Sequence, residues 1–184
     1  MEYRQIIITI ASLLKTFDSK NPIHKSFKPG IGPFGEPQIV KIIAQRLSIM
    51  GIKAYTKRIP DLDIQNQWAI EFKIVRPFGD NGKEAENWSV NMLHPYPGNV
   101  SLISDAIKLL QLGSYPNKGL FVIGFEHKPA RISLDPLINS FEVITKQVMH
   151  INLGERIEQR IEGLVHPEHQ VLRCIGWEII PTRQ

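Results

Sequence analysis

Apolar residues repeat along the chain with a spacing that predicts helices. Between positions 36 and 51 they stand three or four residues apart, at Ile39, Val40, Ile43, Leu47 and Met50. This spacing places them on one side of a helix. Pro37 is suited to the first position of that helix, and Gly51 is suited to end it.

The same spacing returns further along the chain. It predicts a helix over residues 99–113 that Gly113 ends, another over about 136–150, and a further one over about 155–165. In the first of these helices five apolar residues are expected to point inward: Leu102, Ile103, Ala106, Ile107 and Leu110. The apolar run in MEYRQIIITIASLL fits either a helix or a strand that begins the fold.

A two-residue period predicts a hairpin over residues 52–75. Two segments, 52–64 and 68–75, flank Gln65-Asn66-Gln67, which suits a tight turn. Side chains of the second segment alternate between two faces. One face is wholly apolar, with Trp68, Ile70, Phe72 and Ile74. The other face bears Glu71 and Lys73 side by side, between Ala69 and Val75.

Two more strands complete the predicted sheet. The continuous apolar run KGLFVIGF, residues 118–125, is typical of a strand covered on both faces. VLRCIGWEII, residues 171–180, is expected to close the chain as a strand. Residues 76–98 are rich in proline and glycine and are expected to form a long loop. This order predicts a single domain over residues 1–184, with a mixed sheet and helices on both faces.

Composition narrows the class of protein. Hydrophobic residues make up 42% of the 184 residues and charged residues 22%, which is typical of a soluble globular domain. We expect no signal peptide and no membrane span, because the N-terminal apolar run is short and is followed by polar residues. The single cysteine, Cys174, excludes an internal disulfide framework and fits a cytoplasmic protein. The net charge of +4 is compatible with a polyanionic partner.

The segment PDLDIQNQWAIEFK, residues 60–73, concentrates the candidate chemistry. It holds three carboxylates, Asp61, Asp63 and Glu71, with Lys73 on the same strand face as Glu71. Carboxylate oxygens bind hard divalent cations such as Mg²⁺, which activate water and neutralise charge in phosphodiester hydrolysis. The same charges could instead belong to a sheet edge that faces solvent. A Glu-x-Lys triplet alone means little, because the chain repeats it at residues 126–128 with no acidic strand before it.

Pro60-Asp61 followed by Glu71-Phe72-Lys73 resembles the signature of the PD-(D/E)xK nuclease superfamily, and the order of elements over about 36–127 is similar to the core of that family. The resemblance implies a restriction-endonuclease-like fold, which is a three-layer α/β/α sandwich with a central mixed sheet. It also implies that Asp61, Glu71 and the carbonyl of Phe72 bind Mg²⁺ or Mn²⁺. Lys73 would then be the general base or the charge-stabilising residue.

Two assignments in this site stay open at the level of sequence. Asp63 shares a strand face with Asp61, so either could be the metal ligand. A turn at residues 65–67 places Asp61 opposite Glu71 and Asp63 opposite Ala69, which favours Asp61. Glu36 either adds a further carboxylate to the site from the first core helix or caps that helix.

Residues outside the hairpin have both a functional and a structural interpretation. Lys108 or Asn99, near the start of a predicted helix, could hold a substrate phosphate. The pairing of Lys108 with Asp105 is more often a solvated ion pair of little consequence. His166 and His169 suggest zinc, but the chain offers no third and fourth ligand at a known spacing, so a loop is the better interpretation.

The predicted activity is hydrolysis of DNA by a divalent-metal-dependent nuclease, and specifically by an endonuclease. Its catalytic residues would be Asp61, Glu71, Lys73 and Glu36. Cutting both strands would imply a homodimer, RNA remains an alternative substrate, and no membrane partner is expected. The competing hypothesis is a non-catalytic nucleic-acid-binding or interaction module that keeps the nuclease fold.

Overall fold

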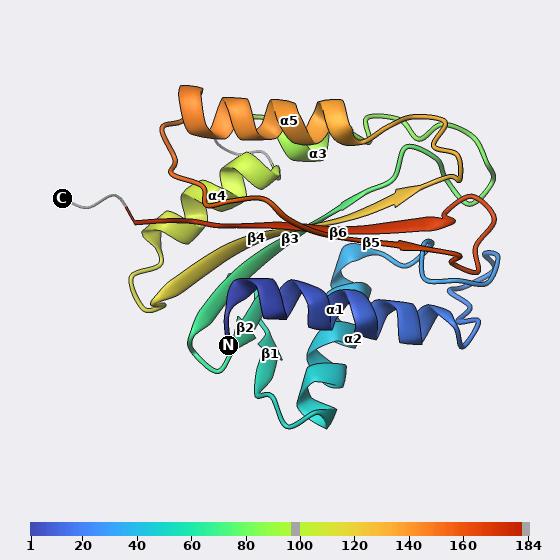
Figure 1. Ribbon diagram of the computed structural model, residues 1–184, viewed down its shortest axis with the longest axis horizontal. Coiled ribbons are helices and arrows are strands. Elements are labelled where there is room, and N and C mark those ends of the chain that lie inside the picture. Colours follow the sequence, from blue (N-terminus) through green and yellow to red (C-terminus); the bar gives the residue numbers. More distant parts are fainter. Residues whose placement is uncertain (97–99, 182–184) are drawn as a thin grey trace.

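The chain forms a six-stranded open sheet with helices on both faces (Figure 1). The computed structural model describes residues 1–96 and 100–181. The strands are β1 (Ala54–Thr56), β2 (Leu62–Ile64), β3 (Trp68–Val75), β4 (Asn117–Glu126), β5 (Ile157–Glu162) and β6 (Val171–Glu178). Their order across the sheet is β1-β2-β3-β4-β6-β5. Only the central pair β3–β4 is parallel among these strands, so the sheet is mixed, as predicted.

The helices form two layers around this sheet. One face carries α1 (Tyr3–Asp18) and α2 (Glu36–Ile49), and the other carries α3 (Val90–Leu93), α4 (Leu102–Gln111) and α5 (Asp135–Val143) (Figure 1). A π-helical segment, Ile144–Val148, continues α5. Among the described helices, none is both long and apolar enough to cross a membrane.

Strand β3 lies between the two layers and contributes to both hydrophobic cores. Its apolar face, including Ile70 and Phe72, packs with α1 and α2. On the opposite face, Ala69 and Val75 pack with α4 and α5. The hairpin turn is confirmed too, since Gln65 and Asn66 adopt the positive φ angles, 57° and 54°, of a two-residue hairpin turn.

The prediction of a helix over residues 155–165 is wrong. This segment is strand β5, which pairs antiparallel with β6 over its whole length. Its Glu, Gln and Arg residues favour helices in isolation, but a neighbouring strand and charged partners override that weak preference. The described part of the predicted long loop, residues 76–96, contains α3 and a bridge between Phe78 and Glu84.

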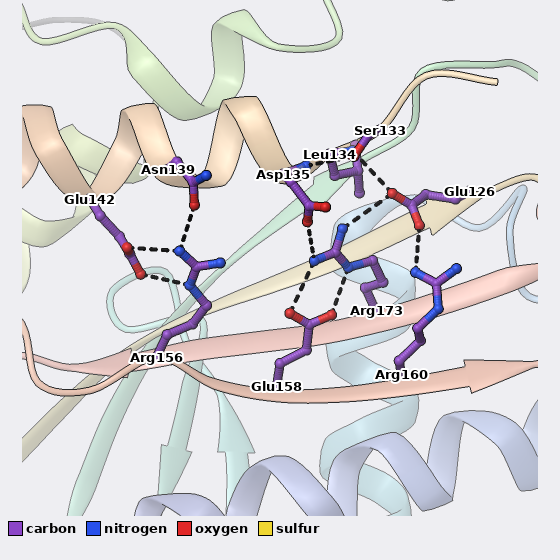
Figure 2. A network of polar contacts seen from close by, with 10 residues as sticks. All are labelled: Glu126, Ser133, Leu134, Asp135, Asn139, Glu142, Arg156, Glu158, Arg160 and Arg173. Atoms are coloured by element: carbon purple, nitrogen blue, oxygen red, sulfur yellow. Dashed lines mark hydrogen bonds and ion pairs between the residues drawn. The ribbon is translucent and has the colours of Figure 1, made fainter. Parts of the chain in front are cut away.

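A buried network of arginines and acids explains why β5 is a strand (Figure 2). Arg173 on β6 makes a two-pronged contact with Glu158 on β5, at 2.7 and 3.0 Å. It also pairs with Glu126 on β4 at 3.2 Å and with Asp135 on α5 at 2.7 Å. Arg160 on β5 binds the second oxygen of Glu126 at 2.9 Å. These contacts, which we call the arginine network, attach both β5 and α5 to the centre of the sheet.

Candidate active site

The site is built where β2 leaves part of β3 uncovered. Strand β2 pairs with β3 only from Trp68 to Ile70, although β3 continues to Val75. On this uncovered edge, the amide of Phe72 donates to Asp61 Oδ2 at 2.9 Å, and the amide of Ile74 donates to Glu36 Oε2 at 3.1 Å. Two carboxylates therefore accept hydrogen bonds from the backbone amides of this edge, in place of the carbonyl groups of a neighbouring strand. We call this place the notch.

Lys73 supplies the positive charge at the notch. Its side chain is buried, and its Nζ donates to the carbonyl oxygen of Phe72 at 2.9 Å. The same Nζ lies 3.5 Å from Glu36 Oε1 and 2.7 Å from Asp105 Oδ2. The contact with Asp105 is an ion pair whose angle falls outside hydrogen-bond geometry. Burial acts to lower the pKa of Lys73, but the charges of Glu36 and Asp105 outweigh it and raise the pKa, so the amine stays protonated.

Glu71 is the least satisfied member of the notch. Its side chain is buried beside Lys73, and one of its oxygens, Oε1, has no hydrogen-bond partner in the described chain. Burial, the charges of Asp61 and Asp105 and a hydrogen bond to Asp61 raise the pKa of Glu71 to about 9. At neutral pH this carboxyl therefore holds a proton. The alternative interpretation, that the charges of this strand simply face solvent, is wrong.

Asp105 on α4 belongs to the notch, although it was not among the predicted site residues. It is buried, with one oxygen facing Lys73 and the other 2.7 Å from Lys108 Nζ. Asp105 therefore lies on the buried face of α4. Leu110, which was expected to point inward, is 42% exposed. The spacing of Leu102, Asp105 and Leu109 could have indicated this, because it is that of one helix face.

The notch holds more acidic than basic side chains. The carboxyl groups of Glu36, Asp61, Glu71 and Asp105 lie near the buried ammonium of Lys73, while Lys108 pairs with Asp105 and the charge of Arg76 acts on Glu36. Burial, with the Asp61 charge adding to it, raises the pKa of Glu36 even though Lys73 opposes the shift. An excess of buried acids over bases is characteristic of a functional site, and it favours the arrival of a further cation.

Asp63 lies outside the notch, in contrast to Asp61. As predicted, it pairs with Ala69 in the β2–β3 register. It accepts hydrogen bonds from Lys57 at 2.5 Å, from Tyr115 at 2.9 Å and from the amide of Asn66 at 2.9 Å. Burial acts to raise the pKa of Asp63, but these hydrogen bonds lower it. Asp63 therefore stabilises the hairpin, whereas Asp61 faces the notch.

The donor set of the notch suits a hard divalent cation. Asp61 and Glu71 supply carboxylate oxygens, Glu71 has an oxygen without a partner, and the carbonyl of Phe72 accepts from the flexible side chain of Lys73. Within residues 1–96 and 100–181, however, no three His, Cys, Asp or Glu side chains are grouped closely enough to hold a metal. A cation would therefore bind to two carboxylates and a carbonyl, and would displace the proton on Glu71.

A pocket of about 420 Å³ opens beside the notch. Glu36 and Asp61 line it on one side, and three cations line it on the other: Lys41, Lys57 and Arg58. Lys57 is engaged by Asp63, whereas Lys41 and Arg58 form no ion pair with any residue of the described ranges. A roomier pocket of about 630 Å³ lies at the other end of β3, beside Trp68, and contains none of the notch residues. Of these two pockets, the smaller one is the one that notch residues line.

The remaining candidates do not join the notch. Lys108 lies close by, but it is paired with Asp105 and 39% exposed, and Asn99 lies outside the described residues. His166 bonds Asp80 at 2.8 Å, and His169 bonds the carbonyl of Phe78 at 2.8 Å. Each histidine is thus held in place by a hydrogen bond from its Nε2 atom.

Comparisons with known proteins do not assign the notch to a family. No family model, no curated protein and no solved structure matches the chain significantly. The similarity to the PD-(D/E)xK superfamily therefore rests on residues 60–73 and on the geometry of the notch, and membership in that superfamily remains a prediction.

Proposed function

We propose that this chain is a divalent-metal-dependent nuclease that hydrolyses DNA phosphodiester bonds, in keeping with the superfamily that residues 60–73 resemble. The observation that carries the proposal is the notch. Four acids and one buried lysine converge on an uncovered strand edge, and a pocket with unpaired cations opens beside them. Excess acid suits a metal, and free cations suit a polyanionic substrate.

The metal site would consist of Asp61, Glu71 and the carbonyl of Phe72. Mg²⁺ or Mn²⁺ bound there supplies an activated water and neutralises charge on the phosphate. Glu71 must lose its proton first, since burial and the neighbouring acids hold its pKa at about 9. Asp61 already orients the amide of Phe72, and so fixes the direction of the adjacent carbonyl.

Lys73 would act as the charge-stabilising residue rather than as the general base. Glu36 and Asp105 raise the pKa of its ammonium, so it has no lone pair with which to accept a proton at neutral pH. A positioned ammonium can donate to a phosphate oxygen as negative charge develops there. Glu36 and Asp105 would serve as positioning residues, because both contact Lys73.

The substrate side of the proposal rests on charge. Lys41 and Arg58 face the pocket without acidic partners among the described residues, so they are free to contact backbone phosphates. DNA is the proposed substrate and RNA the alternative. Endonucleolytic cleavage of both strands would require two copies of the chain, since each copy has a single notch.

Cleavage of supercoiled plasmid with Mg²⁺ tests the proposal. Lys73→Ala is expected to reduce the rate by about 100-fold or more, because it removes an electrostatic contact to the transition state. Lys128→Ala is the matched control, since Lys128 ends the other Glu-x-Lys triplet, is 59% exposed and pairs with Glu162. Equal cleavage by the wild type and Lys73→Ala would point to a contaminating nuclease and overturn the proposal.

A second candidate function is a non-catalytic nucleic-acid-binding module. It is favoured by one observation, that the ammonium of Lys73 is bonded to the carbonyl proposed as a metal ligand. A module of this kind would bind DNA through the pocket cations without hydrolysing it. Thermal unfolding with and without Mn²⁺ separates the two, because a ligand that binds only the folded state raises the unfolding temperature. No shift in the wild type would support the binding module.

A further inference from the structure

The uncovered edge of β3 continues beyond the notch and ends at Arg76. The amide of Ile74 donates to Glu36 of the notch, and Arg76 follows two residues later, directly after the last residue of the strand. Ile74 and Arg76 both line a pocket of about 300 Å³, which we call the Arg76 pocket. This pocket therefore lies next to the notch along the same strand.

Arg76 is a partly buried cation with spare hydrogen-bond donors. Its Nη1 donates to the carbonyl oxygen of Gly32, whereas its Nε and Nη2 have no partner among residues 1–96 and 100–181. Neither of these two nitrogens is sealed from solvent, and the guanidinium forms no ion pair within the same ranges. Nε and Nη2 form the edge with which Arg173 holds both oxygens of Glu158. In Arg76 that edge is free for an anion.

Two more donors line the Arg76 pocket without an acceptor. The indole N–H of Trp88 and the side-chain amide of Asn91 on α3 make no hydrogen bond with any residue that the structure describes. Trp88 is partly buried and packs against the core beneath α4 and α5, which holds its ring in place. A guanidinium, an indole N–H and an amide thus surround one pocket, and an oxygen-rich anion is the ligand that suits such a set of donors.

The acid that lines this pocket, Asp80, is already engaged. Its Oδ1 accepts from the amide of Lys28 at 2.8 Å and lies 2.8 Å from Nε2 of His166. The charge that acts on Arg76 is that of Glu36 and not that of Asp80. Burial lowers the pKa of Arg76 more than Glu36 raises it. Because arginine keeps its charge in proteins, this guanidinium lacks a full counter-charge.

We infer that the Arg76 pocket binds a phosphate group of the nucleic-acid strand that is held at the notch. The inference rests on the proposed function. Lys73 would contact the scissile phosphate, and Arg76, three residues further along the chain, would contact a neighbouring phosphate of the same strand through Nε and Nη2. Asn91 would donate to that phosphate, and Trp88 would pack against its sugar. Arg76 would thereby set the register of the strand at the notch.

Free cations on both sides of the notch favour a nucleic acid over an acidic peptide, which the same guanidinium edge could bind. Lys41 and Arg58 line the pocket that Glu36 and Asp61 also line, whereas Arg76 lies beyond Ile74. Phosphates recur at every residue of a nucleic-acid strand, so one strand can meet cations on both sides.

Fluorescence anisotropy with labelled duplex DNA and no divalent metal tests the inference separately from cleavage. Arg76→Gln should weaken binding about tenfold. It should also reduce the slope of log affinity against log salt concentration by about 0.9, the value for one lost phosphate contact. Arg46→Gln is the matched control and should bind as the wild type does. Arg46 is a partly buried arginine of α2 that lies over Phe17 and forms no ion pair with the described residues.

Neutral linkages locate the contact on the DNA. Methylphosphonate at one position removes the charge of one phosphate and keeps its sugar and base. At one position this change should weaken binding to the wild type about tenfold and leave binding to Arg76→Gln unaffected. If the change weakens both proteins equally at every position, Arg76 contacts no phosphate and the inference is overturned.

A second variant keeps the test valid if Arg76→Gln does not fold. Asn91→Asp changes an exposed residue and places a carboxylate where the phosphate would bind, so affinity should fall about tenfold. Asn152→Asp adds the same charge at an exposed position beside Ile180 and should bind as the wild type does. Thermal unfolding confirms that each variant is folded. Equal affinity of Asn91→Asp and the wild type would overturn the inference, even if plasmid is cut.

The failure of the nuclease proposal has a different signature. DNA that is bound through Arg76 but left intact when Mg²⁺ is added would overturn hydrolysis and support the phosphate site. Arg76-dependent binding followed by cleavage supports both. Absence of binding to DNA and RNA, or tighter Arg76-dependent binding of a polyglutamate peptide than of either nucleic acid, would overturn the inference.

Discussion

The notch and the arginine network are both buried groups of charges on the same sheet, yet they are balanced differently. In the arginine network each acid has a cationic partner with direct contacts: Glu158 and Asp135 bind Arg173, and Glu126 binds Arg173 and Arg160 (Figure 2). The pKa of Asp135 is lowered, chiefly by its hydrogen bond with Arg173. Every acid of this network is thus in direct contact with an arginine.

In the notch two acids, Asp61 and Glu71, form no ion pair with any residue of the described ranges. Glu36 and Asp105 share Lys73, while Glu71 keeps a proton and an oxygen without a hydrogen bond. Burial of charge therefore does not by itself mark a functional site. What distinguishes the notch is the unsatisfied carboxyl of Glu71, because selection for stability alone would favour the arrangement of the arginine network.

Disrupting the arginine network should have the largest effect on stability. Arg173→Met removes the shared cation of the buried Glu126, the partly buried Glu158 and the exposed Asp135. We expect a loss of about 3–5 kcal/mol in the free energy of unfolding, as for other broken buried ion pairs. Urea unfolding measures it, with Arg160→Met as the control, since Arg160 is 43% exposed and should cost less. Equal losses for the two variants would contradict the central position of Arg173.

Removing an acid from the notch should instead raise the free energy of unfolding. The pKa of Glu71 is raised from 4.5 to about 9 in the folded chain, so the folded state binds more protons than the unfolded state between these values. Stability from this group is therefore lost as the pH rises from 4.5 through 9. Glu71→Gln cannot ionise and so avoids that loss. We expect the variant to have a free energy of unfolding about 3 kcal/mol higher than the wild type at pH 7, and almost the same as the wild type near pH 4.

The matched variant for this prediction is Glu158→Gln in the arginine network. It loses a two-pronged contact with Arg173 and should destabilise the chain at pH 7. Urea unfolding of both variants at pH 5, 7 and 9 gives the comparison directly. If Glu71→Gln is destabilising at pH 7 and above, the prediction that ionised Glu71 destabilises the folded chain is wrong.

Metal binding at the notch should be coupled to the release of a proton. Because Glu71 is protonated at pH 7, binding of Mn²⁺ should release about one proton per site, and the apparent affinity should rise about tenfold per pH unit up to about pH 9. Titration calorimetry in buffers of different ionisation enthalpy measures the proton count. Glu71→Gln should bind metal weakly and release no proton. Tight binding without proton release would place the metal elsewhere.

The smallest effect is expected at the outer edge of the notch. Lys108→Ala removes a partly exposed partner of Asp105, whose other oxygen still faces Lys73. We expect the free energy of unfolding to change by less than about 0.5 kcal/mol, as for most exposed ion pairs. Thermal unfolding measures it, with Asp105→Asn as the buried counterpart. A large loss for Lys108→Ala alone would mean that it neutralises the notch.

The sequence predicted the central part of this arrangement because strand periodicity is strict. Alternation placed Glu71 and Lys73 on one face of β3, and a turn at residues 65–67 separated Asp61 from Asp63 by register. The helix over residues 36–51 was recognisable from one apolar stripe, and Glu36 at its start lies at the notch.

Other parts depend on contacts between distant segments, which local patterns do not record. Asp105 resembled a solvated helix residue because Lys108 stands three positions away, and only the packing of α4 on β3 buries it. The segment 157–162 resembled a helix because its residues favour helices, and only the partners Arg173 and Glu126 explain its strand.

The ammonium of Lys73 gives the acids of the notch a counter-ion that belongs to the chain itself. It is covalently attached two residues from Glu71, so its effective concentration at the notch does not vary with the cations of the medium. A strand edge rich in acid can thereby form with an internal counter-ion already in place. Under the proposed function, an external cation would compete with this tethered one for the carbonyl oxygen of Phe72.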